Sequence, residues 1–148
     1  MQIKIDTALL DGLTQQAKAS PRLRMNYDLR NSAADTSQRM LNAIEPGSVV
    51  PVHRHPKTSE TMVVLRGRVA EEFYDDAGEV LERFVLGACG DARSELGMTG
   101  EESDMTFALN IPAGTWHTLR ALESGTVILE FKDGAFEPIG ECDILNKK

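Results

Sequence analysis

The chain has 148 residues, of which 41% are hydrophobic, and a formal net charge of -7 at pH 7. This length and apolar content predict one globular domain with its own core. The acidic balance offers no broad basic face to a phosphate backbone, so we expect no nucleic-acid partner. No apolar run reaches the length of a membrane span, and the N-terminus lacks the apolar stretch of a signal peptide. We therefore expect a cytoplasmic protein with no membrane partner.

Cysteine usage agrees with this expectation. Cys89 and Cys142 are too few for a disulfide scaffold, and neither belongs to a CxxC motif. Reduced thiols in a cytosolic protein are the simpler interpretation.

The N-terminal segment predicts one helix followed by a polar stretch. Asp6 can cap a helix over residues 6–19, and Ser20-Pro21 ends it, because a residue before proline is pushed out of the helical region. Residues 22–39 are polar and rich in arginine, which is typical of a solvated connector or of a segment that binds an anion. The apolar residues of the helix recur at helical spacing: Leu9, Leu10, Leu13 and Ala17.

From Met40 onward the pattern changes to short strands broken by turns. The sequence "DDAG" at 75–78 predicts a tight hairpin, and the glycine-rich, acidic stretch 87–104 predicts a long loop. Many short strands without interleaved helices favour an all-β sandwich or closed barrel. The expected strands cover residues 39–44, 61–67, 68–74, 80–86, 105–112 and 126–131.

Two of the three histidines of the chain lie two residues apart, at His53 and His55. On a strand such residues share a face, and Glu60 opens the next strand near enough to add a carboxylate oxygen. Imidazole with carboxylate suits iron, manganese, zinc, nickel or cobalt better than magnesium or calcium. From this spacing alone, a pair of exposed histidines without a ligand is an equally good interpretation.

The wider spacing resembles the two signatures of the cupin superfamily. Residues Gly47 to Gly67 follow G-x5-H-x-H-x4-E-x6-G at every position, and "PAGTWH", ending at His117, matches P-x-G-x2-H of the second signature. The ends of the second signature differ, with Thr106 and Ala121 in place of its glycine and asparagine. A Pro-x-Gly turn supports the match, because it gives a sharp entry into the next strand.

This resemblance implies a double-stranded β-helix, or jelly-roll barrel, with one N-terminal α-helix. It also implies that His117 lies opposite the first motif, so that one divalent transition metal ion is held by His53, His55, Glu60 and His117. Four protein ligands would leave one or two positions for water or substrate, which marks a catalytic or ligand-binding site. The expected organisation is a helix and basic connector over 1–38, a barrel over 39–140 and a tail over 141–148.

A narrower resemblance covers Ile5 to about Pro138. "SPRLRMNYDLRNS", "QRMLNAIEPGSVVPVHRHP", "ETMVVLRG" and "LESGTVILEFKDG" are similar to the WbuC family of cupin-fold metalloproteins. Members are often encoded near bacterial O-antigen and surface-polysaccharide genes. The resemblance implies the fold and the metal, but no reaction.

Several polar groups are candidates for binding a substrate. Planar guanidinium groups suit phosphate or carboxylate, provided that the segment folds over the barrel mouth. The alternative is that these arginines pair with surface acids. The predicted substrate-binding residues are Arg22, Arg24, Asn26, Tyr27 and, if its strand face is interior, Asn42.

The leading functional hypothesis is a metal-dependent enzyme acting on a small anionic metabolite, such as a sugar phosphate or nucleotide sugar, in O-antigen biosynthesis. An isomerase or epimerase and an iron-dependent dioxygenase both fit the ligand set. The rival hypothesis is a module that binds or senses a small molecule through its metal without turnover. Open sheet edges lead us to expect a homodimer.

Overall fold

A computed structural model describes residues 2–89 and 106–145, so most of the expected loop over 87–104 lies outside the described residues. One helix and eight strands follow one another in these ranges, with a short 3-10 helix, η1, near the C-terminus. The elements are α1 (Thr7–Ala19), β1 (Arg24–Asp28), β2 (Ser37–Ile44), β3 (Glu60–Arg66), β4 (Arg68–Tyr74), β5 (Val80–Gly87), β6 (Ala108–Ile111), β7 (Trp116–Ala121), β8 (Thr126–Asp133) and η1 (Glu141–Asp143).

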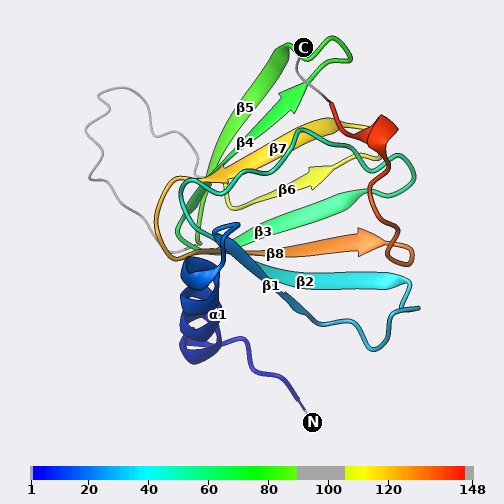
Figure 1. Cartoon of the computed structure of the whole chain (residues 1–148). Helices are drawn as coiled ribbons and strands as arrows, with labels where there is room; N and C mark the ends of the chain where they lie inside the picture. The colour runs from blue at the N-terminus through cyan, green and yellow to red at the C-terminus, as the bar shows by residue number, and fades with distance from the viewer. Residues whose placement is uncertain (1, 90–105, 146–148) are drawn as a thin grey trace, which may run out of the picture.

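The strands form two antiparallel sheets, one in the order β1-β2-β8-β3-β6 and the other in the order β5-β4-β7. The two sheets lie one above the other in Figure 1, with α1 beside the larger sheet. The predicted all-β class with a single N-terminal helix is confirmed. The predicted hairpin is confirmed as well, because β4 and β5 pair on either side of residues 75–78.

Apolar residues pack on both faces of the larger sheet because strand side chains alternate. On β2, Leu41 and Ala43 point toward α1, whereas Ile44 points between the two sheets. The layer between the sheets contains Ile44, Met62, Val64, Val69, Leu86, Leu119, Ala121 and Ile128. The layer under the helix contains Leu10, Leu13, Ala17, Leu41, Ala43 and Val127.

One polar side chain caps α1, and another links it to the larger sheet. The Asp6 carboxylate caps the helix by accepting from the backbone N–H of Leu9 at 3.1 Å. Arg66, at the end of β3, donates to Thr14 Oγ1 at 2.7 Å and to the Leu10 carbonyl at 3.1 Å. The helix therefore covers the outer face of the larger sheet, on the side opposite the layer between the sheets.

Strand β1 lies in the stretch that the sequence suggested as a connector. It pairs with β2, with Asn26 opposite Asn42, so it extends the larger sheet. Met25 and Tyr27 alternate with polar residues and pack on the cluster under the helix. Only two apolar side chains mark this face, which is too weak a pattern to distinguish a strand from a polar connector.

The C-terminal segment returns to the end of the sheets where β8 finishes (Figure 1). The backbone N–H of Leu145 donates to the Val52 carbonyl at 2.8 Å, and that of Arg54 donates to the Asp143 carbonyl at 3.1 Å. The segment therefore lies beside the histidine motif. Among the described residues, no helix combines the length and apolar character needed to cross a membrane.

Candidate metal centre

Backbone pairing brings the two histidine motifs together. His53 lies in an extended segment between β2 and β3, and His117 is the second residue of β7. The His53 N–H donates to the His117 carbonyl at 3.0 Å, and the His117 N–H donates to the His53 carbonyl at 2.8 Å. This reciprocal pair of hydrogen bonds fixes side by side two segments that are 64 residues apart in the sequence, 117 minus 53.

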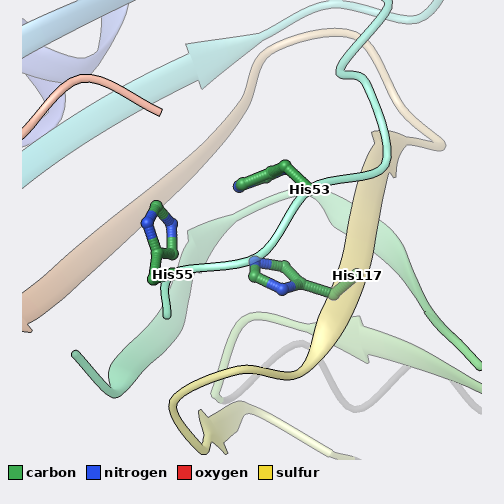
Figure 2. A group of neighbouring side chains, drawn as sticks. All are labelled: His53, His55 and His117. Atoms are coloured by element: carbon green, nitrogen blue, oxygen red, sulfur yellow. The ribbon is translucent and has the colours of Figure 1, made fainter. Parts of the chain in front are cut away.

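The three imidazole rings converge. Figure 2 shows His53 and His55 on one segment, with His117 reaching toward them from β7. The ring centroid of His53 lies 5.1 Å from that of His55 and 4.5 Å from that of His117, and the remaining pair is 5.8 Å apart. One nitrogen from each ring lies within 4.8 Å of the other two, a spacing at which one metal ion can contact all three.

Hydrogen bonds fix the tautomers of two of these rings. His53 Nδ1 lies 2.9 Å from the Pro51 carbonyl, and His117 Nδ1 lies 2.9 Å from the Thr115 carbonyl. Because a carbonyl only accepts, each Nδ1 carries the hydrogen and each Nε2 keeps a lone pair. Carbonyl partners of this kind orient metal-binding histidines in many proteins.

Burial keeps these two rings neutral. It lowers the pKa of His53 to about 4, assisted by the nearby His117. Burial also lowers the pKa of His117, which is 2% exposed. Near pH 7 both lone pairs are therefore available to a cation without prior loss of a proton.

Glu60 begins β3 and is 4% exposed. Its Oε2 lies 3.0 Å from Lys132 Nζ and 3.2 Å from His55 Nε2, and Lys132 Nζ lies 3.1 Å from the same His55 nitrogen. Burial by itself would raise the pKa of Glu60, but its contacts with His55 and Lys132 hold it at about 2. Glu60 is therefore an anion at neutral pH.

The residues present fit a divalent transition metal. Glu60 Oε2 is buried beside the imidazoles, and its close contacts are not aligned as hydrogen bonds among the described residues. A buried anionic oxygen without such a bond next to available imidazole nitrogens is the mixed donor set that these metals accept. In the described arrangement Glu60 contacts Lys132 and His55, while the three histidines form the close group.

Two further carboxyl groups face the layer between the sheets. Glu71 on β4 is opposite Leu119, and Glu130 on β8 is opposite Met62, and both partners belong to the core. Burial, with the charge of Glu60 second, raises the pKa of Glu71 to about 9 and that of Glu130 to about 8. Both groups are therefore mainly protonated near pH 7.

Sequence reasoning missed Lys132, Glu71 and Glu130 as interior polar groups. Each is a charged residue in a strand with other charged residues, where a charge usually indicates the solvent face. The signal available in the sequence was the alternation of residues along the strand. Lys132 follows Ile128 and Glu130 at alternate positions, so all three share one face of β8.

A cavity of about 580 Å³ opens beside this centre, with His55 and Lys132 in its lining. The C-terminal residues 134–140 form much of its wall, together with Gln38 and Arg54. Such a volume suits a small organic ligand. The histidine centre is therefore next to a space that can hold a substrate.

The predicted substrate-binding residues are not all near this cavity. Asn42 faces the interior, where its hydrogen bond to Glu130 partly offsets the raised pKa of that carboxyl group. Arg24 donates to the Val49 carbonyl at 2.5 Å and lies opposite Ile44 on β2, whereas Lys132 lies opposite Gln38. These two β2 positions are six residues apart, 44 minus 38, or about 20 Å along the strand.

The other three predicted residues lie on β1 or just before it. Arg22 is exposed, and Asn26 Nδ2 lies 3.3 Å from Met40 Sδ. Tyr27 packs on the cluster under α1. The structure thus brings the three histidines, Glu60 and Asn42 to the interior, but it does not bring Arg24 or Tyr27 to the histidines.

Comparison with solved structures shows the fold. KdgF from Halomonas sp. aligns with a TM-score of 0.54 at 16% identity, over 78% of this chain and 82% of KdgF. The capsular polysaccharide assembling protein CapF from Staphylococcus aureus aligns at 0.60 and 18%, over 80% of this chain but 30% of CapF. An oxalate oxidase in complex with the substrate analogue glycolate aligns at 0.58 and 14%, over 83% of this chain and 57% of the oxidase.

These neighbours have the cupin fold, so the predicted fold is confirmed. This chain spans less than a third of the length of CapF. No curated protein matches the sequence. Residues 5–86, more than half of the chain, match a family described as a domain of unknown function, DUF6016. The chain therefore belongs to the DUF6016 family and has a cupin fold, with three histidines whose ring nitrogens lie within 4.8 Å of one another.

Proposed function

We propose that this chain is a metal-dependent enzyme that acts on a small anionic metabolite, such as a sugar phosphate or nucleotide sugar. The observation that carries the proposal is the grouping of three imidazole nitrogens within 4.8 Å beside a cavity of about 580 Å³. The WbuC-like sequence motifs and the likeness to the fold of CapF, a capsular polysaccharide assembling protein, support a role in surface-polysaccharide metabolism.

We propose that His53, His55 and His117 hold the metal through ring nitrogens and that Glu60 supplies a carboxylate oxygen. A divalent ion in such a site polarises a substrate oxygen or activates a bound water. The substrate would contact the cavity wall, while Asn42 contributes an interior amide that bonds to Glu130. Arg22, Arg24, Asn26 and Tyr27 stay a sequence prediction, and an Arg24 variant tests it below.

Metal binding is tested by equilibrium dialysis of the purified protein against cobalt, zinc, manganese, nickel and iron(II). We expect one ion per chain for the wild type. We expect at least a hundredfold weaker binding for His53→Gln or His117→Gln, because each change removes one of few ligands from a site that needs all of them. For Glu60→Gln we expect about tenfold or greater weakening.

Glu137→Gln is the matched control. Glu137 pairs with Lys57 where both side chains are more than two-thirds exposed, so this variant should bind metal as the wild type does. Unchanged metal affinity in both histidine variants would contradict the proposed site.

Turnover separates the candidate reactions. The metal-loaded protein is incubated with a panel of sugar phosphates and nucleotide sugars, and products are followed by mass spectrometry together with oxygen uptake. An isomer or epimer without oxygen uptake indicates an isomerase, and oxygen consumption with iron indicates a dioxygenase. Ligand binding without a product would contradict the proposed enzyme and favour a binding module.

We also propose that the protein acts in the cytoplasm as a homodimer. The unpaired side of an edge strand such as β1 is available for pairing with a second copy. Sedimentation velocity of the metal-loaded protein should show a single species of twice the chain mass, and a monomer at micromolar concentration would contradict this proposal.

A further inference from the structure

We propose that Lys132 is the oxyanion-binding group of the cavity and that a divalent cation frees it for this role by taking its partners, His55 and Glu60. The inference rests on the proposed metal site and identifies the part of the chain that recognises the anionic end of the ligand. The ligand class is an oxyanion, either a phosphate or a carboxylate.

Lys132 links the metal centre to the cavity. Its ammonium group lies 3.0 Å from Glu60 Oε2 and 3.1 Å from His55 Nε2, while the residue also lines the cavity. Its side chain is 19% exposed. Rotation about the bonds of its flexible side chain is therefore enough to turn the ammonium group from the metal centre toward the cavity.

A metal ion bound through His55 Nε2 would compete with Lys132 for this atom. An imidazole nitrogen without a hydrogen has one lone pair, and in the tautomer that leaves this lone pair on Nε2, His55 accepts there from Lys132 at 3.1 Å. A metal ion held through that nitrogen must displace the ammonium group. If Glu60 also binds the ion, Lys132 loses both of its described partners in the centre.

Charge balance then favours an anion. Without metal, Lys132 and Glu60 together contribute no net charge. A divalent cation adds two positive charges to a largely buried place, and a buried charge without compensation is costly. An oxyanion that contacts both the cation and Lys132 supplies the compensation.

The other cations in the described cavity lining already have acidic partners away from the metal. Arg54 contacts Asp143 at 2.8 Å and lies 4.4 Å from the centroid of the Trp116 ring, while Lys57 contacts Glu137 at 3.2 Å. Metal binding leaves these pairs intact. Lys132 is therefore the lining cation, among the described residues, that the metal itself sets free.

The test combines cobalt loading with anion titration. Cobalt is used because its visible absorption reports its coordination, and calorimetry gives the affinities for inorganic phosphate and, separately, for glycolate. We expect the preferred anion to bind cobalt-loaded wild type at least tenfold more tightly than the metal-free protein. We expect Lys132→Met to keep cobalt binding but to lose at least tenfold in affinity for that anion.

Two other variants test where in the molecule the anion binds. Lys18→Met removes a lysine from the last turn of α1 and should bind the anion as the wild type does. Arg24→Ala tests the arginine segment as the alternative anion site. Loss of anion binding in Arg24→Ala, with Lys132→Met unchanged, would overturn the inference and leave the metal proposal standing.

The remaining outcomes are also decisive. Equal anion affinity with and without cobalt overturns the inference alone, whereas failure of the wild type to bind any divalent metal overturns it together with the proposed function. If Lys132→Met does not fold, the wild type still provides a test. Coupling between sites is reciprocal, so the anion must raise the cobalt affinity of the wild type by the same factor, and no change would contradict the inference.

Discussion

Glu71 is fully buried on the inner face of β4, and among the described residues neither of its carboxyl oxygens has a hydrogen-bond partner. It lies opposite Leu119, two residues beyond His117 on β7, so it is a diagonal neighbour of that histidine on the same face. Burial, more than the charges of Glu60 and Glu130, raises its pKa to about 9. A neutral carboxylic acid therefore lies next to the histidine centre, on the neighbouring strand.

Replacing Glu71 by Gln should stabilise the protein in a pH-dependent way. Above pH 4.5, the ordinary pKa of the group, the unfolded chain loses this proton while the native chain keeps it up to about pH 9. The native state therefore binds more protons, and its free energy of unfolding falls across this interval, by up to about 1.4 kcal/mol per pH unit. Glutamine cannot ionise and avoids this loss.

Urea unfolding of the metal-free protein at pH 4, 6 and 8 provides the measurement. We expect Glu71→Gln and wild type to be about equal at pH 4, with a gap in favour of the variant that widens toward pH 8. The exposed Glu137→Gln should follow the wild type at every pH. A gap that does not change with pH would show that Glu71 does not titrate as described.

The turn between β3 and β4 depends on the close approach of another strand. Gly67 has a φ of 77°. A Cβ atom built on it would lie 2.8 Å from the Cα atom of Thr126, which is the first residue of β8. Real Cβ atoms essentially never come so close to backbone. This contact gives a physical reason for the glycine that closes the first cupin motif.

Gly67→Ala should destabilise the protein by at least about 2 kcal/mol, because both the positive φ and the contact with Thr126 oppose a side chain. Gly12→Ala is the matched change, since nothing lies within 4 Å of a Cβ at this helical position. There we expect stabilisation of up to about 1 kcal/mol, from the higher helix propensity of alanine. Thermal and urea unfolding of both variants would show the opposite signs, and equal effects would contradict this account.

On the scale of the whole molecule, the C-terminal segment 134–145 completes the site that the sheets begin. It contributes residues 134–140 and Asp143 to the cavity wall, and Leu145 packs with Val52, Tyr74 and Trp116. Arg54, between the two histidines of the first motif, contacts Asp143 at 2.8 Å. The metal motif and the end of the described chain are thus fastened to one another.

Asp143→Asn should loosen this wall. The change replaces the charged acceptor of Arg54 by a neutral amide. The Asp143 side chain is 13% exposed and that of Arg54 is 32% exposed, so we expect the free energy of unfolding to fall by about 1–2 kcal/mol. Hydrogen exchange should show faster opening of the backbone N–H groups of Arg54 and Leu145, which donate across this contact. Glu137→Gln breaks an exposed pair in the same segment and should change exchange little. Equal protection in wild type and Asp143→Asn would contradict this role.

The sequence by itself determined the all-β class, the N-terminal helix and most strands, because hydrophobic periodicity and turn residues are local signals. The spacing of Gly47, His53, His55, Glu60 and Gly67 was likewise readable without coordinates. These features depend on neighbours within a few residues along the chain. Strand β1 escaped prediction because its apolar face has only Met25 and Tyr27.

Only the tertiary structure decided which polar groups meet in the interior. Lys132 reaches His55 and Glu60 because the register of β8 against β3 places residues 72 positions apart, 132 minus 60, opposite one another. Glu71 faces the same interior through the pairing of β4 with β7. Such contacts depend on strand register and sheet order, which follow from the packing of the whole chain; alternation along one strand shows which residues share a face, but not which residues of other strands they meet.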